Sequence, residues 1–280
     1  VDSVVTIVKL ALSTLGCPEW DIEQICSVGR EVGYDGIDFR GYQEQLDVTR
    51  HPLFTEQSDT TASKIAHIGL RTSAFSSSIR LCDADAREAN VTEAERLVEV
   101  ATAFDADRIR VFGGGDSDRS TDELARIGGD TMNAILDIDG ASDLRWMVET
   151  HDEWTSSQDC RRLLDELPEE HTGILWDAAH TIRLADETPT ETLDILGDRI
   201  EYVHIKDAVL DMSHDDATDD GYVYTLPGTG DLPMNDVIAA LHDDGYDGWL
   251  AYEHEKRWHP SIPEPEEAFP AFVDWFRSLE

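Results

Sequence analysis

The chain has 280 residues, of which 40% are hydrophobic, and its formal net charge is −38 at pH 7. This hydrophobic content is sufficient for a sizeable core, and no apolar stretch approaches the length that a membrane-spanning helix needs. Nucleic-acid binding usually requires a basic face, so the acidic excess argues against a protein that binds DNA or RNA.

The acidic excess is combined with a near absence of lysine, which occurs only four times. Carboxylates at this density repel one another unless counterions screen them, and the screening length falls to about 3 Å in molar salt. The composition therefore resembles that of proteins from halophiles that accumulate salt. The hydrophobic periodicity is too strong for a disordered chain.

The four cysteines form no C-x-x-C pair and lie far apart in the sequence. This arrangement indicates neither a disulfide framework nor a cysteine metal site, and it fits a reducing compartment. The N-terminal stretch "VDSVVTIVKLALSTLG" lacks the basic region and the cleavage site of a signal peptide. We therefore expect a soluble cytoplasmic protein, and the sequence leaves a homo-oligomer open.

Short β-like runs alternate with amphipathic helical stretches along the chain. Clear helical patterns cover residues 18–33, 86–104 and 234–245, and the predicted strands cover residues 8–14, 36–40, 69–75, 108–114, 144–150, 173–180, 202–208 and 248–254. Eight strand–helix units in a chain of this length predict an α/β fold, a single (β/α)₈ TIM barrel over residues 1–280. A doubly wound open sheet is the alternative, but no G-x-G-x-x-G sequence follows the first strand to favour it.

Two similar segments support the barrel. Residues 33–40, "GYDGIDFR", and residues 245–253, "GYDGWLAYE", each read as a glycine that ends a helix, a tight turn and a strand. A long interruption, residues 208–232, separates the seventh strand from its helix. In a barrel this loop lies on the catalytic face, so we predict that it can act as an active-site lid.

The last four predicted strands each carry an acidic residue or a histidine near the C-terminal end. These residues are Glu149, Asp177, His204 and Glu253. They recur about every 28 residues, close to one strand–helix unit, except that the last interval contains the long loop. Because parallel barrel strands end on the same face, we expect the four side chains to meet at one point.

Three carboxylates that converge without a counter-charge repel one another strongly. A divalent cation removes this conflict, and oxygen donors with one imidazole suit Mn²⁺, Mg²⁺ or Co²⁺, with Zn²⁺ as an alternative. His180 follows Asp177 by three residues, so its imidazole can face the same cavity if the chain turns after the strand. A structural role for His180 at the rim of the barrel is the alternative.

Together, Glu149, the D-x-x-H sequence of Asp177 and His180, the H-x-K-D sequence that starts at His204, and Glu253 resemble the xylose isomerase-like TIM barrels. This family is also called the sugar phosphate isomerase/epimerase family. The similarity spans the chain and includes "GYDGIDFRG", "RVFGGG" and "EKRWHP". The resemblance implies an enzyme that acts on a small sugar, keto-polyol or sugar phosphate, with one divalent metal held by the four strand-end residues.

The resemblance also implies a mechanism. In the epimerases of this family the metal chelates two neighbouring oxygens of a hydroxy-ketone and stabilises the enediolate that forms when the adjacent proton leaves. Here Glu149 and Glu253 would exchange that proton as base and acid, and His180 would steady a substrate oxygen. We therefore expect an isomerase or epimerase.

Other functions stay open. A dehydratase similar to inosose or dehydroshikimate dehydratase would use the same metal but lose a hydroxyl. The epimerases usually place an arginine soon after the seventh-strand histidine, whereas this chain reads "AVLDMSHDD" after "HIKD". A phosphodiesterase similar to endonuclease IV needs further histidine ligands, which "SAFSSS" and "VFGGG" do not supply. The two glutamates argue against a barrel that binds without turnover.

Two arginines near strand ends are candidates for contacts with the substrate. Arg40 ends the second predicted strand, and Arg110 lies in the fourth. A guanidinium group can bind a carboxylate or phosphate with two parallel hydrogen bonds. The alternative for both is an internal ion pair with Asp38 or Glu149.

A lysine and two tryptophans complete the set of candidates. Lys206 could act as an electrostatic partner of the enediolate, or it could pair with Asp177 or Asp207 instead. Trp154 and Trp258 could stack on the apolar face of a sugar. Packing at the barrel mouth is the commoner role of such tryptophans.

Overall fold

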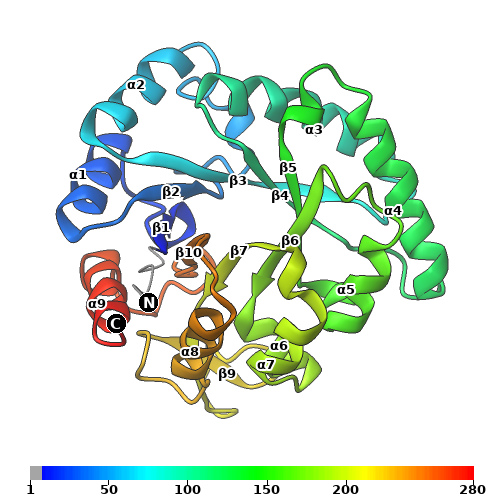
Figure 1. Cartoon of the computed structure of the whole chain (residues 1–280). Helices are drawn as coiled ribbons and strands as arrows, with labels where there is room; N and C mark the ends of the chain where they lie inside the picture. The colour runs from blue at the N-terminus through cyan, green and yellow to red at the C-terminus, as the bar shows by residue number, and fades with distance from the viewer. Residues whose placement is uncertain (1–7) are drawn as a thin grey trace, which may run out of the picture.

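The computed structural model describes residues 8–280, and in this range eight parallel strands close into a barrel. The order around the barrel is β1-β10-β7-β6-β5-β4-β3-β2. Helices surround the strands on the outside, as the view along the barrel in Figure 1 shows. The predicted (β/α)₈ barrel is therefore confirmed.

The barrel strands lie close to the predicted runs. They are β1 (Lys9–Ser13), β2 (Gly36–Phe39), β3 (Arg71–Arg80), β4 (Arg108–Phe112), β5 (Arg145–Glu149), β6 (Thr172–Asp177), β7 (Ile200–Ile205) and β10 (Trp249–Tyr252). The main helices are α1 (Ile22–Val32), α2 (Ser58–Ile68), α3 (Arg87–Ala103), α4 (Thr121–Leu136), α5 (Ser157–Leu164), α6 (Ala178–Ala185), α7 (Pro189–Leu196), α8 (Met234–Asp244) and α9 (Pro265–Arg277).

Three strands end at least three residues away from the prediction. The seventh predicted strand included residues 206–208, but β7 ends at Ile205, and Asp207 belongs to the separate strand β8 (Asp207–Leu210). Strand β3 continues to Arg80, beyond the predicted end at residue 75. The sixth predicted strand included residues 178–180, but these residues start helix α6. The reason is local: the side chain of Asp177 accepts a hydrogen bond from the backbone N–H of His180 and so caps the first turn of the helix.

The glycines of the two similar segments end helices, as predicted. Gly33 follows α1 with a φ of 105°, and Gly245 follows α8 with a φ of 79°. A residue with a side chain would be strained in this left-handed conformation, which glycine adopts easily. Each glycine therefore stops its helix and lets the chain turn into the next barrel strand.

The barrel strands are buried on both faces. One apolar core lies between the strands and the helices, and a second fills the barrel interior with Ala11, Ala74, Met147, Leu175, Tyr202, Trp249 and Ala251. Inside the barrel, the Tyr202 hydroxyl and Ser73 Oγ share a hydrogen bond of 2.8 Å. Because the interior is filled, open space for chemistry is left at the strand ends.

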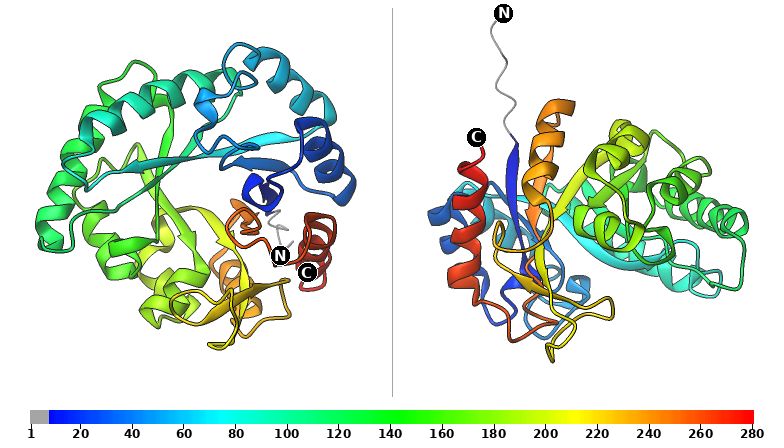
Figure 2. Two further views of the ribbon diagram at one scale, coloured as in Figure 1. Left: turned by 180° about the vertical axis from the view of Figure 1, so that it is seen from behind. Right: turned by 90° about the horizontal axis from the view of Figure 1, so that it is seen from below.

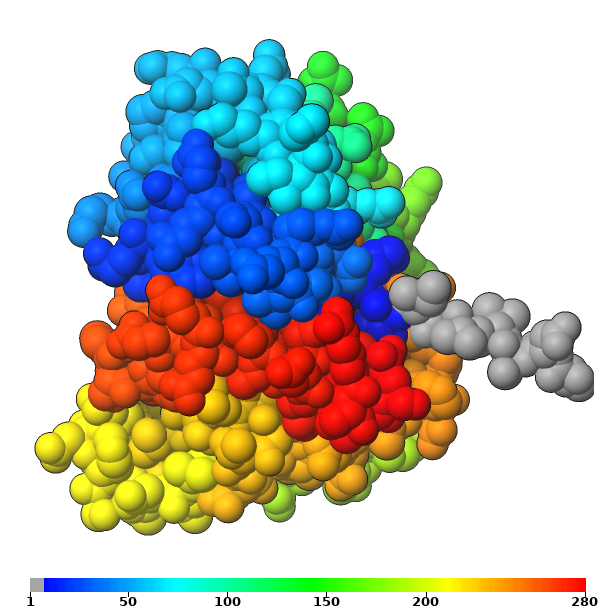
Figure 3. All heavy atoms as spheres, turned by 90° about the vertical axis from the view of Figure 1, so that its left-hand side faces the viewer, coloured from blue at the N-terminus to red at the C-terminus, as the bar shows by residue number. Residues whose placement is uncertain are grey.

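The two ends of the described chain pack together. Helix α9 lies beside the N-terminal elements, as the space-filling view in Figure 3 shows. The hydroxyl of Tyr34, which follows α1, donates a hydrogen bond of 3.0 Å to the backbone oxygen of Phe269 in α9. The ring of strands and helices is thereby closed on the outside as well as in the sheet.

The loop at residues 208–232 contains a β-hairpin. Strands β8 (Asp207–Leu210) and β9 (Tyr222–Thr225) pair in antiparallel fashion, separate from the barrel sheet. Figure 2 (right) shows this hairpin at the end of the barrel opposite to the C-terminus. The loop thus lies on the face that the sequence predicted, and its role as a lid stays a prediction.

Among residues 8–280 no helix combines the length and the apolar character that crossing a bilayer requires. Residues 1–7, which belong to the stretch without signal-peptide features, lie outside the described residues. The four cysteines are buried and free, so they form no disulfide.

Candidate metal centre and substrate cavity

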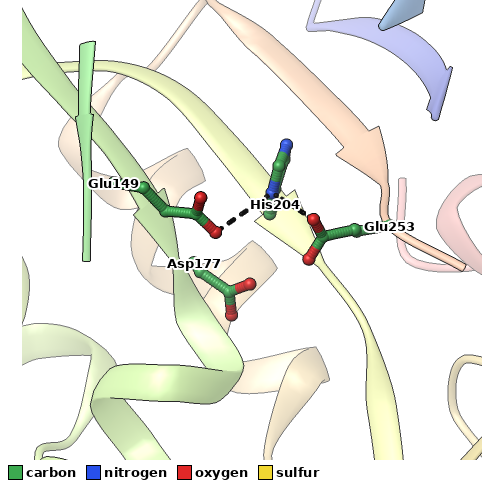
Figure 4. Close-up of side chains that lie close together, drawn as sticks. All are labelled: Glu149, Asp177, His204 and Glu253. Atoms are coloured by element: carbon green, nitrogen blue, oxygen red, sulfur yellow. Dashed lines mark ion pairs between the residues drawn. The ribbon is translucent and has the colours of Figure 1, made fainter. Parts of the chain in front are cut away.

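The four strand-end residues meet at one point on the C-terminal face of the barrel. Glu149 ends β5, Asp177 ends β6, His204 lies in β7 and Glu253 directly follows β10. One ligand atom from each residue lies within 4.8 Å of the others, and all four side chains are buried. Figure 4 shows that the carboxylates of Glu149 and Glu253 point toward the imidazole of His204 from two sides, with Asp177 next to them.

His204 is oriented by a residue from the opposite side of the barrel. Asp38 in β2 accepts a hydrogen bond of 3.1 Å from His204 Nε2 and a second one of 2.9 Å from Ser76 Oγ. The other ring nitrogen, Nδ1, therefore faces Glu253 Oε1 at 3.3 Å and Glu149 Oε1 at 3.7 Å. A carboxylate that fixes the ring of a histidine ligand in this way is typical of metal sites.

The electrostatics of the site reveal the conflict between the carboxylates. Burial raises the pKa of Asp177 to about 6; Lys206 opposes this rise, and the carboxylates of Glu253 and Glu149 add to it. Burial also acts to raise the pKa of Glu149, but the Arg110 guanidinium and His204 outweigh it and leave that pKa lowered. Positive charge is thus required if all three carboxylates are to stay ionised.

The donor set fits a divalent cation. Three of the buried ligand atoms make no hydrogen bond among the described residues: Glu149 Oε2, Asp177 Oδ2 and His204 Nδ1. The two oxygens have only ion-pair contacts, Glu149 Oε2 with Arg110 and Asp177 Oδ2 with Lys206. Buried polar atoms without hydrogen bonds are costly, and a cation would give all three atoms a ligand bond at once. Three carboxylates and one imidazole suit Mn²⁺, Mg²⁺, Co²⁺ or Zn²⁺.

Lys206 also reaches the centre from β7's C-terminal end, on the same side as His204. Its Nζ donates hydrogen bonds of 2.7 Å to Glu253 Oε2 and 2.7 Å to Glu255 Oε1, and it lies 2.8 Å from Asp177 Oδ2. The predicted alternative of a pair with Asp177 is therefore present. Asp207 is not one of its partners among the described ion pairs, because its carboxylate accepts hydrogen bonds from backbone N–H groups instead.

A small cavity of about 80 Å³ lies beside the four converging side chains. Its walls carry five of the predicted substrate contacts, and the residues that line it are Leu15, Arg40, Arg110, Phe112, Glu149, His151, His180, Lys206, Glu253, Glu255 and Trp258. Most of the polar groups among them come from different strands. A small polar ligand in this cavity would therefore contact several barrel strands at once.

The two arginines have different surroundings. Arg110 Nε lies 3.2 Å from Glu149 Oε2, and its guanidinium stacks on the ring of Phe112. The internal ion pair predicted as its alternative is therefore formed. Arg40 donates a hydrogen bond to Ser78 Oγ, and no ion pair with Asp38 occurs among the described residues. Arg40 is thus the freer of the two guanidinium groups in the cavity wall.

His180 lines the cavity as a neutral imidazole. Its Nδ1–H donates a hydrogen bond of 3.0 Å to the backbone oxygen of Thr150, which leaves Nε2 without a proton. Burial, with help from the positive charges of Lys206 and His151, lowers the pKa of His180 to about 3. Its position follows from the N-terminal cap of α6, since the turn after Asp177 brings residue 180 back toward the site.

The structure places a further histidine, His151, in the cavity wall, which the sequence pattern did not predict. Its Nδ1 lies 2.7 Å from Asp152 Oδ1, and its ring packs on Phe112 and on His180. Arg80 holds Asp152 from the other side at 3.0 Å, and Asp152 has a positive φ of 52°. The signal was present in "ETHDE", where strand alternation directs Glu149 and His151 to the same side.

The two tryptophan predictions have different outcomes. Trp258 lines the cavity and is 50% exposed, so its ring is accessible to a ligand. Trp154 is fully buried, and its Nε1 donates a hydrogen bond of 2.8 Å to the backbone oxygen of Gly114. Trp154 therefore packs beneath the loop after β4 and does not line the cavity, which is the packing role that the sequence analysis gave as the alternative to stacking.

Comparisons with known proteins agree with this architecture. A family model described as "Xylose isomerase-like TIM barrel" matches residues 27–279. Inosose dehydratase from Geobacillus thermodenitrificans is 30% identical over 121 residues, and this match spans 40% of the chain but only 39% of that protein's length.

Two solved structures share the fold at low sequence identity. The IolI protein with a bound zinc atom is 16% identical with a TM-score of 0.78, and the match covers 97% of this chain and 98% of that one. D-Psicose 3-epimerase from Clostridium cellulolyticum H10, solved with D-tagatose, is 13% identical with a TM-score of 0.73 and coverages of 97% and 99%. Since the family match extends over most of the sequence and the barrel is closed, the chain belongs to the xylose isomerase-like TIM barrel family.

Proposed function

We propose that this protein is a divalent-metal-dependent isomerase or epimerase of a small sugar, keto-polyol or sugar phosphate. The observation that supports this function best is the convergence of Glu149, Asp177, His204 and Glu253 beside a small polar cavity. Two of these residues are glutamates on non-adjacent strands, and both also line the cavity. A substrate there would contact both carboxylates.

A divalent cation, when bound, polarises a ketone carbonyl and stabilises negative charge on the neighbouring oxygen. Glu149 and Glu253 then act as the proton carriers: one carboxylate removes the proton from the carbon next to the carbonyl, and a carboxylic acid returns a proton. Arg110 and Lys206 stabilise the ionised forms of Glu149 and Glu253, so either carboxylate can act as the base and becomes the carboxylic acid once it has taken the proton. Return of that proton to the other carbon gives an isomer. An epimer forms when the second glutamate, after taking up a proton from a substrate hydroxyl or from solvent, delivers it to the opposite face.

Polar groups around the cavity would hold the hydroxyl groups of the substrate. Arg40 offers N–H donors, the free Nε2 of His180 offers an acceptor, and the ammonium group of Lys206 contributes a positive charge. The half-exposed ring of Trp258 lies at the cavity wall, where it can cover the apolar face of a sugar. This combination favours a polyhydroxylated ketone over an apolar substrate.

A dehydratase is the second candidate, and the pair of His151 and Asp152 favours it. Burial acts to lower the pKa of His151, but the nearby carboxylates of Asp152 and Glu149 outweigh it and raise that pKa. A protonated imidazole in the cavity wall could donate its proton to a departing hydroxyl group, so that water is lost after the carbon-bound proton is removed. The partial match with an inosose dehydratase supports the same candidate.

Titration calorimetry with Mn²⁺ in molar KCl tests the shared part of both candidates. We expect one cation per chain, bound at least tenfold more weakly by Glu253→Gln, which corresponds to about 1.4 kcal/mol or more. A panel of ketoses and keto-polyols in D₂O then shows whether the carbon-bound proton exchanges. An isomeric product supports the isomerase or epimerase, and an unsaturated or dicarbonyl product supports the dehydratase. A folded wild type that binds no divalent cation would refute both.

A further inference from the structure

Lys206 places a buried ammonium group among the carboxylates that are expected to hold the cation. Its Nζ lies 2.8 Å from Asp177 Oδ2 and 2.7 Å from Glu253 Oε2. A divalent cation on the same carboxylates would lie close to this positive charge, and like charges repel strongly where water is excluded. The affinity of the site for a cation therefore depends on where the ammonium group is held.

The oxygens of Glu253 are divided between two partners. Oε1 faces His204 Nδ1 at 3.3 Å, whereas Oε2 accepts the hydrogen bond from Lys206. Oε1 lies on the side of the ring nitrogen that also faces Glu149. Glu253 can therefore offer one oxygen to a cation and keep its bond to the lysine.

Asp177 has no such second oxygen to offer. Its Oδ1 accepts the hydrogen bond of 3.1 Å from the backbone N–H of His180 and so caps helix α6. Its Oδ2 is the oxygen that lies 2.8 Å from Lys206 Nζ. Lys206 and a cation would thus compete for Asp177 Oδ2.

Glu255 gives the ammonium group a position that does not depend on Asp177. Its Oε1 accepts a hydrogen bond of 2.7 Å from Lys206 Nζ, and it is not one of the four converging donors. On the hairpin, the ring of Tyr224 lies 5.6 Å from the same nitrogen and packs against His259. His259 Nε2 in turn lies 3.9 Å from Glu255 Oε2. The lysine is therefore held from the outer side of the site as well.

We infer that Lys206 is a built-in counter-ion that competes with the divalent cation for Asp177 Oδ2, and that Glu255 retains the ammonium group when the cation binds. The inference rests on the proposed function, because it requires that the four donors bind a cation. Lys206 and Glu255 are positioning residues in this scheme, and they change the affinity in opposite directions. Loss of Lys206 removes the competitor, whereas loss of Glu255 leaves the ammonium group with Asp177 and Glu253.

The test is Mn²⁺ titration calorimetry on the full chain and on three variants, after removal of bound metal with a chelator. We expect at least tenfold tighter binding for Lys206→Met and at least threefold weaker binding for Glu255→Gln. Lys64→Met is the matched control, because Lys64 pairs with Glu23 at the surface; its affinity should equal that of the wild type. The melting temperature gives an independent readout: Mn²⁺ should raise it more for Lys206→Met than for the wild type.

The outcomes separate this inference from the proposed function. A wild type that binds no Mn²⁺ refutes the proposed function. A wild type that binds Mn²⁺, together with equal or weaker binding by Lys206→Met, overturns the inference about Lys206 alone. If Lys206→Met does not fold without metal, Glu255→Gln decides, since unchanged or tighter binding by that variant also overturns the inference.

Discussion

Barrel strands β1–β4 and barrel strands β5, β6, β7 and β10 end on the same face, but the two halves bring different groups to it. The first half contributes the guanidinium groups of Arg40 and Arg110, together with serine hydroxyls of β3. The second half contributes all four converging donors. Positive charge at one wall thus faces negative charge at the other.

The difference assigns two tasks to two sets of strands. In our proposal the second half holds the cation and moves the proton, and the first half binds and orients substrate oxygens. Asp38 is an exception, because it lies in β2 of the first half but accepts a hydrogen bond from His204 in the second half. The predictions below test the division by altering one half at a time.

The largest effect is expected from Glu253→Gln in the second half. An amide cannot carry the proton and is a poorer ligand, so kcat should fall by about 10²–10⁴. Activity of the Mn²⁺-loaded enzyme on the ketose or keto-polyol that exchanges deuterium measures this effect. Glu267→Gln, an exposed change in α9, is the control. Loss of less than tenfold would mean that Glu253 does not carry the proton.

The second half also contains a buried histidine, His254, whose titration should affect stability. Burial lowers its pKa to about 4, and the positive charge of Lys256 adds to this effect, whereas the hydrogen bond from Nε2 to the backbone oxygen of Pro263 opposes it. The unfolded chain takes up the proton near pH 6.5, whereas the folded protein takes it up only near pH 4. The contribution of His254 to the free energy of unfolding is therefore complete above pH 6.5 and is lost as the pH falls toward 4. The loss from this group should be up to about 3 kcal/mol.

Denaturant unfolding between pH 7 and 4, with a chelator present, measures this loss. His254→Gln should show a smaller loss over the same range, because its side chain does not titrate. A variant with an unchanged slope of stability against pH would show that other groups cause the acid sensitivity.

Asp38→Asn tests the residue that crosses the division. The amide holds the imidazole of His204 less firmly and lowers its basicity, so Mn²⁺ affinity should fall by about 10–100-fold. Ser76→Ala removes only the hydrogen bond that Asp38 accepts from Oγ, and its effect should be clearly smaller. Equal affinities for wild type and Asp38→Asn in calorimetry would contradict a role of Asp38 in holding the ring.

The smallest effect is expected from Arg40→Met in the first half. Loss of its N–H donors should raise KM about tenfold, roughly 1.4 kcal/mol, with little change in kcat or in Mn²⁺ affinity. Arg30→Met, an exposed change in the last turn of α1, should change neither constant. A fall in Mn²⁺ affinity for Arg40→Met would show that the first half also supports the cation.

The sequence predicted the barrel and the residues that converge at its mouth, because both follow from repetition. Asp177 and His204 occupy equivalent places near the C-terminal ends of consecutive barrel strands. Closure of the barrel brings such places together. No repeated pattern in the sequence indicates that Asp38 is the hydrogen-bond partner of His204. Asp38 lies 166 residues away, and only the closed sheet shows that the two side chains touch.

Local backbone details were also beyond the reach of the pattern. The turn at Asp152 has a positive φ, and it directs His151 into the cavity and Trp154 into the core. The hydropathy of the sequence does not distinguish a tryptophan in the core from one in the cavity wall. For Lys206, the sequence left Asp177 and Asp207 as alternative partners. In the structure Lys206 pairs with Asp177, and the carboxylate of Asp207 accepts hydrogen bonds from the backbone N–H groups of Gly228 and Gly230.

The bonds around Asp207 have a consequence for protein engineering. Asp207 is the first residue of β8, and its carboxylate accepts hydrogen bonds from the backbone N–H groups of Gly228 and Gly230, which follow β9. Nearer the tip of the hairpin, Arg183 in α6 donates hydrogen bonds to Asp220 and Thr218. The segment between these fixed points, residues 211–217, is therefore an exchangeable cassette. New loop sequences grafted there would change the tip of the hairpin, while the barrel and its four converging donors remain in place.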